Sequence, residues 1–121
     1  MATRLMLVDD EAQEMALRAR VLTSLGCEIL VASDPATAVE IAATRLLDFA
    51  VVDYDMPGMN GCILADRLKS VQPGLKIAIY SGAVTIPDGD IEGVDLFVSK
   101  TEGVFELLRR ISKLLGPGRA D

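Results

Sequence analysis

Three aspartates that follow two apolar runs are the residues of this sequence best suited to chemistry. Asp9 and Asp10 directly follow Leu5 to Val8, and Asp53 directly follows Phe49 to Val52. Short apolar runs of this kind predict buried strands. Strands that both end in acids lie side by side only in a parallel sheet, whose strands are joined by helical crossovers. We therefore expect the three carboxylates, here called the acidic site, to converge at one edge of a sheet.

Carboxylates that converge repel one another. Like charges about 4 Å apart interact by roughly 4 kcal/mol at an effective dielectric near 20, so such a cluster binds a cation or takes up a proton. Every ligand is an oxygen, which favours Mg²⁺ over zinc or copper. The alternative is that these aspartates only cap the helices that follow. Two runs that end in acids together favour the metal site.

The composition narrows the class of protein. The chain has 121 residues, enough for one core, and half of them are hydrophobic. A net charge of -6 argues against nucleic acid as a direct partner, because phosphate binding needs a basic face. The absence of histidine excludes Ser-His-Asp and Cys-His hydrolases as well as a histidine-ligated metal.

Features tied to cell compartment are sparse. Cys27 and Cys62 are far apart and form no C-x-x-C motif, so we expect no disulfide and a reducing environment. The sequence shows no leader pattern and no apolar run near the length of a membrane span. We expect a cytoplasmic protein that does not engage a membrane.

The elements that must position the acids alternate between strand and helix. The predicted strands are Arg4 to Asp10, Glu28 to Ser33, the run that ends at Asp53, Lys76 to Tyr80 and Leu96 to Ser99. The predicted helices are Glu11 to Leu25, Asp34-Pro35 to about Arg45, Asn60-Gly61 to Val71 and Glu102 to Leu115, the last with Phe105, Leu108, Ile111 and Leu115 on one face. This alternation predicts an α/β fold, with one five-stranded parallel sheet, right-handed crossovers and helices on both faces.

These segments together resemble the receiver domain of bacterial two-component response regulators, such as the chemotaxis response regulator. The matching segments follow the family's order along nearly the whole chain: Asp9-Asp10, Asp53 to Gly61, Ile77 to Ala83 and Leu96 to Lys100. The resemblance implies a flavodoxin-like, doubly wound sheet of order 2-1-3-4-5. It also implies a single receiver domain over residues 1–116, with residues 117–121 as a tail or the start of a linker.

The resemblance implies a phosphorylation site built on Mg²⁺. Asp53 would accept a phosphoryl group from a sensor histidine kinase or a phosphotransfer protein, and the switched domain would bind a downstream protein that the sequence does not identify. Asp10 would hold Mg²⁺ directly and Asp9 mostly through water. Asp53 and the main-chain carbonyl of Asp55 would complete the protein ligands.

Further roles follow from the same resemblance. Lys100 would place its ammonium on one phosphoryl oxygen, and Ser81 would donate its hydroxyl to another. Tyr54 and Gly82 would add phosphate contacts. Phe97 would turn inward when Ser81 moves toward the phosphate, although a plain core phenylalanine is an equally good interpretation.

Three departures from the family pattern lead to separate expectations. The side chain of Asp55 adds an acid where the family often has a neutral residue. Thr101 replaces the usual proline, so we expect a trans peptide between Lys100 and Thr101. Val84 to Gly93 contains a proline and glycines where the family has its fourth helix, so we expect that helix to be shortened or irregular and not to form a dimer.

Three classes of function remain open from the sequence. The first is a phosphorylatable receiver, which catalyses only its own phosphoryl acceptance and autodephosphorylation and is otherwise not an enzyme. The second is a receiver-like module that binds proteins without phosphorylation. The third is a phosphatase like those of the haloacid dehalogenase superfamily, because Asp53-Tyr54-Asp55 has the D-x-D form of their nucleophile and general acid.

Overall fold

A computed structural model describes residues 2–82 and 93–115 of the chain. Its five strands form one parallel sheet in the order β2-β1-β3-β4-β5. The predicted flavodoxin-like strand order is confirmed. The strands are β1 (Arg4–Val8), β2 (Glu28–Ala32), β3 (Phe49–Val52), β4 (Lys76–Ser81) and β5 (Leu96–Ser99).

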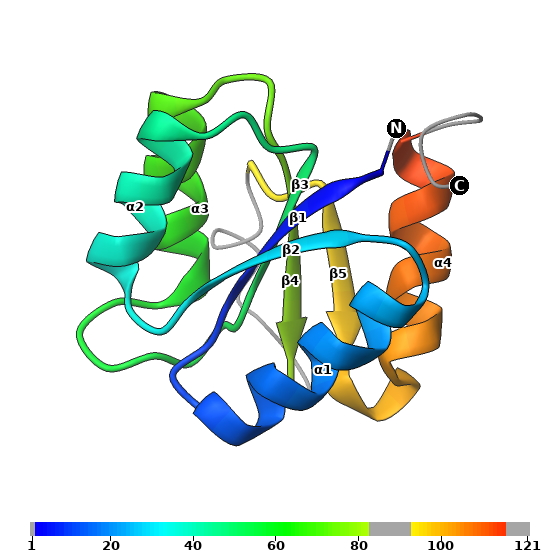
Figure 1. The fold of residues 1–121 in the computed structure, drawn as a ribbon. Coiled ribbons are helices and arrows are strands. Elements are labelled where there is room, and N and C mark those ends of the chain that lie inside the picture. The colour runs from blue at the N-terminus through cyan, green and yellow to red at the C-terminus, as the bar shows by residue number, and fades with distance from the viewer. Residues whose placement is uncertain (1, 83–92, 116–121) are drawn as a thin grey trace.

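The helices cover both faces of the sheet, as predicted. Figure 1 shows α2 and α3 together on one side of the sheet and α1 and α4 on the other. The segment in which we expected an irregular fourth helix falls almost wholly within residues 83–92, which lie outside the described residues. The label α4 therefore belongs to the final helix. The helices are α1 (Ala12–Ser24), α2 (Pro35–Thr44), α3 (Gly61–Val71), the short 3-10 turn η2 (Lys100–Glu102) and α4 (Val104–Leu115).

The sheet divides the hydrophobic core into two halves. Met6 and Val8 of β1 pack on the side of α2 and α3, whereas Leu5 and Leu7 pack on the side of α1 and α4. Every residue of β3 is buried. A parallel sheet that is covered on both faces needs apolar side chains at successive positions. This requirement explains the continuous apolar runs that precede the aspartates.

Two helices begin at the residues that the sequence indicated. The side chain of Asp34 accepts a hydrogen bond from the backbone N–H of Thr37 at 2.8 Å, and Pro35 opens α2. The side chain of Asn60 accepts one from the backbone N–H of Ile63 at 2.9 Å, at the start of α3. These bonds satisfy backbone donors that a helix leaves unpaired in its first turn.

The final helix differs from its prediction in its start and in its apolar face. It begins at Val104, because Gly103 adopts a positive φ of 87° that separates α4 from the turn containing Glu102. Phe105 was predicted on the buried face but is 68% exposed, whereas Leu107 is fully buried. Successive helical residues are about 100° apart, so the stripe of apolar residues that includes Leu107 leaves Phe105 to one side of it.

The first two strands end earlier than predicted. β1 ends at Val8, two residues earlier than expected, and β2 ends one residue earlier. Asp9 and Asp10 therefore lie in the loop just beyond β1.

Both cysteines are free thiols, as expected. In the described part of the chain, no helix has the length and apolar character needed to cross a membrane.

Candidate functional site

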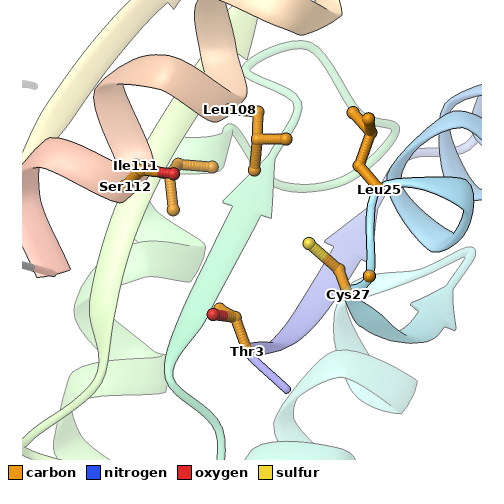
Figure 2. Close-up of a pocket in the computed structure, with 7 residues that line it drawn as sticks. Thr3, Leu25, Cys27, Leu108, Ile111 and Ser112 are labelled. Carbon is orange, nitrogen blue, oxygen red and sulfur yellow. The ribbon is translucent and has the colours of Figure 1, made fainter. Parts of the chain in front are cut away.

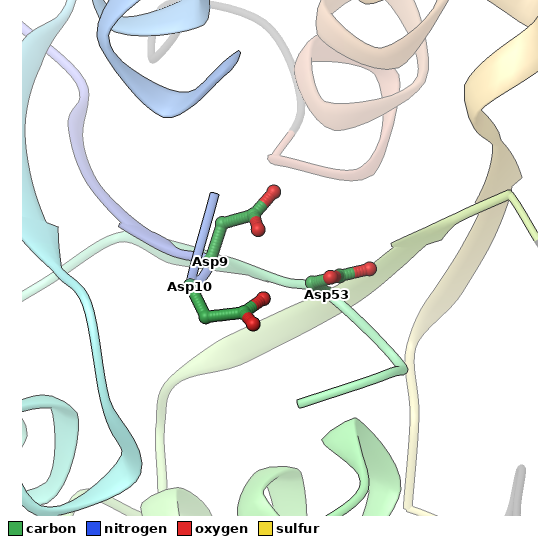
Figure 3. Close-up of side chains that lie close together, drawn as sticks. All are labelled: Asp9, Asp10 and Asp53. Carbon is green, nitrogen blue, oxygen red and sulfur yellow. The ribbon is translucent and has the colours of Figure 1, made fainter. Parts of the chain in front are cut away.

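The acidic site lies at the carboxyl ends of β1 and β3, which are neighbours in the sheet. Figure 3 shows the side chains of Asp9, Asp10 and Asp53 gathered at this edge. One carboxylate oxygen from each residue lies within 4.8 Å of those of the other two. The backbone N–H of Asp53 donates to the carbonyl of Val8 at 2.9 Å, which holds the two segments together. The expected convergence of the carboxylates is confirmed.

The three carboxylates differ in their exposure to solvent. Asp9 is fully buried and Asp53 is 8% exposed, whereas Asp10 is exposed. Burial, the largest cause, and the negative charge of Asp9 together raise the pKa of Asp53 to about 6, against the opposing effect of Lys100. This edge therefore carries more negative charge than its surroundings stabilise. A set of carboxylate oxygens in that condition suits a hard divalent cation such as Mg²⁺.

Lys100 lies among the acids. Its Nζ is 3.5 Å from Oδ1 of Asp53, 3.6 Å from Oδ2 of Asp9 and 3.6 Å from Oε2 of Glu14. Burial lowers the pKa of Lys100, but the charges of Asp53 and Asp9 outweigh burial and raise it. A protonated ammonium next to Asp53 is placed to neutralise charge that develops on this carboxylate.

Hydrogen bonds hold the backbone of Lys100 in a short turn. Ser99 and Glu102 form a capping box around it, in which the backbone N–H of Ser99 donates to Glu102 Oε2 at 3.1 Å. Arg110 of α4 donates to Glu102 Oε1 at 3.1 Å and to the carbonyl of Phe97 at 3.1 Å. The predicted trans peptide at Lys100 is confirmed, since no cis peptide occurs among the described residues. In this chain the capping box, rather than a proline, shapes the loop.

Arg18 also belongs to the site, although no motif in the sequence predicts it there. Its Nη2 donates to Oδ2 of Asp9 at 2.7 Å. Burial raises the pKa of Asp9, but the bonds from Arg18 and from the backbone N–H of Glu11, together with Lys100, lower it below its ordinary value. The spacing of Glu14 and Arg18, one helical turn apart, was the only sequence signal.

The remaining predicted site residues lie around the same edge. Ser81 ends β4, is fully buried and is in register with Ser99, the residue before Lys100. Gly82 follows it and is exposed, with open space where a Cβ would be. Both residues are therefore at the carboxyl end of a strand next to β3.

Three more predicted residues lie near the acids but outside their cluster. Tyr54 and Phe97 are partly buried and pack against the half of the core under α2 and α3. The side chain of Asp55 is exposed and is not one of the clustered carboxylates. The predicted use of its main-chain carbonyl does not require its side chain.

Gly61 supports the loop that carries Asp53. Its N–H donates to the carbonyl of Tyr54 at 2.7 Å, and a Cβ at this position would collide with the backbone carbonyl oxygen of Asp53. We predict that Gly61→Ala lowers the free energy of unfolding by about 2 kcal/mol, because overpacking against backbone forces a shift of the loop. Urea denaturation measures this difference. Gly74→Ala is the control, because a Cβ there meets open space; an equal loss in both variants contradicts the prediction.

A small cavity at the opposite edge of the sheet offers no competing site. Figure 2 shows Thr3 and Cys27, near the amino ends of β1 and β2, facing Leu108 and Ile111 of α4. The cavity has a volume of about 10 Å³, which is close to the space that a single water molecule needs. This cavity is therefore too small to compete with the acidic site as a place for a ligand.

Comparisons with known proteins agree with this geometry. Residues 5–112 match the family described as the response regulator receiver domain. TcrX of Mycobacterium tuberculosis, described as a probable transcriptional regulatory protein, is 28% identical over 113 residues, which cover 91% of this chain and 48% of TcrX. The chain thus spans about half the length of the curated mycobacterial relatives it matches.

Solved structures share the fold. A CheY-like receiver domain from Methanospirillum hungatei superposes with a TM-score of 0.88 at 21% identity, covering 95% of this chain and 94% of that one. TrrA from Thermotoga maritima, in complex with Mg²⁺ and BeF, gives a TM-score of 0.85 at 25% identity, covering 94% of this chain and 99% of TrrA. Each likeness extends over nearly the whole chain.

Proposed function

This chain belongs to the response regulator receiver domain family of two-component signalling, and from that premise we propose that Asp53 is its phosphoryl acceptor. One observation carries the proposal. The carboxylate of Asp53 lies within a cluster of three acids and 3.5 Å from the ammonium of Lys100. A nucleophile, a set of metal ligands and a cation are thereby brought to one edge of a rigid sheet.

The reaction is a transfer of a phosphoryl group to a carboxylate. An oxygen of Asp53 forms a bond to phosphorus while the bond from phosphorus to the donor's nitrogen or oxygen breaks, and the bonding electrons stay with the donor. Such a transfer depends on in-line placement and on charge neutralisation more than on acid-base help. Lys100 places its positive charge beside one phosphoryl oxygen, and the hydroxyl of Ser81 donates a hydrogen bond to another. Water later hydrolyses the acyl phosphate.

Mg²⁺ fits the donors of the acidic site. When bound, it neutralises the charge of the phosphoryl oxygens. Asp10 is the exposed acid and would hold the ion directly, and Asp9 would hold it mostly through water. Asp53 and the main-chain carbonyl of Asp55 would complete the ligands. The complex of the related TrrA with Mg²⁺ and BeF supports this assignment.

We predict that Asp10→Asn weakens Mg²⁺ binding about tenfold or more, equivalent to 1.4 kcal/mol. The variant loses a charged ligand but relieves repulsion in the acidic site, so without metal it should unfold at an equal or higher urea concentration. Isothermal titration calorimetry with MgCl₂ measures the affinity. Asp34→Asn is the control, because Asp34 caps α2 and asparagine caps helices equally well. Unchanged Mg²⁺ affinity in Asp10→Asn removes Asp10 from the ligands.

The phosphoryl donor is a sensor histidine kinase or a phosphotransfer protein in the cytoplasm. The family is a signalling domain rather than a conventional enzyme, and the only chemistry proposed here is phosphoryl acceptance with autodephosphorylation. The relatives described as transcriptional regulators are about twice as long as this chain. Given the net charge of -6, any contact with DNA in this protein falls to a segment other than the receiver domain.

Intact-mass spectrometry tests the proposed function. Incubation with acetyl phosphate and MgCl₂ should add one phosphoryl group to each chain, and removal of the metal with EDTA should prevent it. Sustained turnover of phosphomonoesters would instead support the D-x-D phosphatase. Absence of any labelling would support a module that binds proteins without phosphorylation.

A further inference from the structure

Arg18 makes a buried ion pair inside the acidic site. Its side chain is only 11% exposed, and its Nη2 lies 2.7 Å from Oδ2 of the fully buried Asp9. The same nitrogen lies 3.6 Å from Oε2 of Glu14. The guanidinium carbon of Arg18 is also 5.2 Å from the centre of the Tyr80 ring, a distance at which a cation is attracted to the face of an aromatic ring.

These contacts bridge three elements of the fold. Arg18 comes from α1, Asp9 follows β1, and Tyr80 belongs to β4 immediately before Ser81. The guanidinium thus contacts both an aromatic ring and a carboxylate. An arginine fixed in this way is part of the site and not a solvated surface charge.

The charges near the acidic site explain why such a residue is present. Asp9, Asp10 and Asp53 contribute three carboxylates, and Lys100 lies near two of them. Arg18 adds a second positive charge directly on the most buried acid. Removing one partner of a buried ion pair leaves an uncompensated charge, which destabilises the folded state strongly.

We propose that Arg18 is a built-in counter-ion that stabilises the metal-free acidic site and, by Coulomb repulsion, sets how tightly the site binds Mg²⁺. Arg18 is then a positioning residue, which acts on the metal through Asp9. The inference rests on the metal site of the proposed function. It adds a regulator of metal affinity that lies on helix α1.

Arg18→Met tests this role because it removes the charge and keeps an unbranched apolar side chain. The variant should bind Mg²⁺ about three- to tenfold more tightly in calorimetry with MgCl₂. It should also melt at a lower temperature than the parent without metal, and saturating MgCl₂ should raise its Tm by more than it raises that of the parent. This coupling separates the proposal from a purely structural role, for which metal would not reduce the deficit.

Two further variants complete the experiment. Arg20→Met changes an exposed arginine of the same helix and should leave the Mg²⁺ affinity and its effect on Tm unchanged. Arg18→Lys keeps the charge, so its Mg²⁺ affinity should stay within about twofold of that of the parent. This variant provides the affinity measurement if Arg18→Met does not fold without metal. In that case folding of Arg18→Met on addition of MgCl₂, followed by circular dichroism, supports the proposal.

The possible results distinguish a failure of the role of Arg18 from a failure of the proposed Mg²⁺ site. If the parent binds Mg²⁺ and Arg18→Met binds it equally or more weakly, the role of Arg18 is overturned while the metal site stands. A Tm deficit of the same size with and without MgCl₂, or an Arg18→Met chain that stays unfolded in saturating MgCl₂, also overturns it. If neither protein binds Mg²⁺, the metal site itself falls, and the inference falls with it.

Discussion

Asp53→Asn is expected to abolish phosphoryl incorporation from acetyl phosphate. The substitution keeps the shape of the side chain but replaces the carboxylate oxygen that attacks phosphorus with a neutral amide. Asp9 cannot take over as the acceptor, because it is fully buried and already accepts bonds from Arg18 and from the backbone N–H of Glu11. Intact-mass spectrometry after incubation with MgCl₂ should show the unmodified mass alone.

Asp55→Asn is the matched control for this experiment. Asp55 is two residues away and exposed, and only its main-chain carbonyl is proposed to serve the site. This variant should still accept one phosphoryl group. Labelling of Asp53→Asn to the same extent as the parent would show that another residue is the acceptor, and loss of labelling in Asp55→Asn alone would point to the D-x-D chemistry of a phosphatase.

Asp53→Asn is also expected to stabilise the metal-free protein by roughly 3 kcal/mol at neutral pH, at about 1.4 kcal/mol for each unit of pKa change. The pKa of Asp53 is raised from 3.8 to about 6, first by burial and then by Asp9. The folded state therefore binds the proton more tightly than the unfolded state does. An ionised Asp53 weakens the fold above pH 6, and asparagine removes that cost.

The pH dependence gives the sign of this effect. As the pH falls from above 6 toward about 4, the parent protein takes up the proton on Asp53 and recovers stability, so the advantage of Asp53→Asn should shrink. Urea denaturation in EDTA at pH 7.5 and at about pH 4.5 measures both values. Asp55→Asn should show no gain of this size. Equal unfolding free energies for Asp53→Asn and the parent at neutral pH would show that the ionised carboxylate of Asp53 does not destabilise the fold.

Local patterns in the sequence were sufficient to predict most of the fold. The apolar runs before Asp9 and Asp53 predict strands because a sheet covered on both faces requires them. Asp34 and Asn60 predict helix starts because a capping side chain bonds to a backbone N–H only three residues ahead. Once the sheet is parallel, acids at strand ends share one edge, so the convergence of the carboxylates followed as well.

Only the tertiary structure decided which other side chains reach that edge. Lys100 meets Asp9 across a long separation in sequence, and Arg18 meets it from the next helix along the chain. Both contacts depend on how α1 and the loop after β5 are oriented on the sheet. The exposure of Phe105 likewise depends on which face of α4 packs inward. The periodicity of apolar residues indicates whether a segment forms a strand or a helix. The rotation of that helix against the sheet is set by the packing of both surfaces.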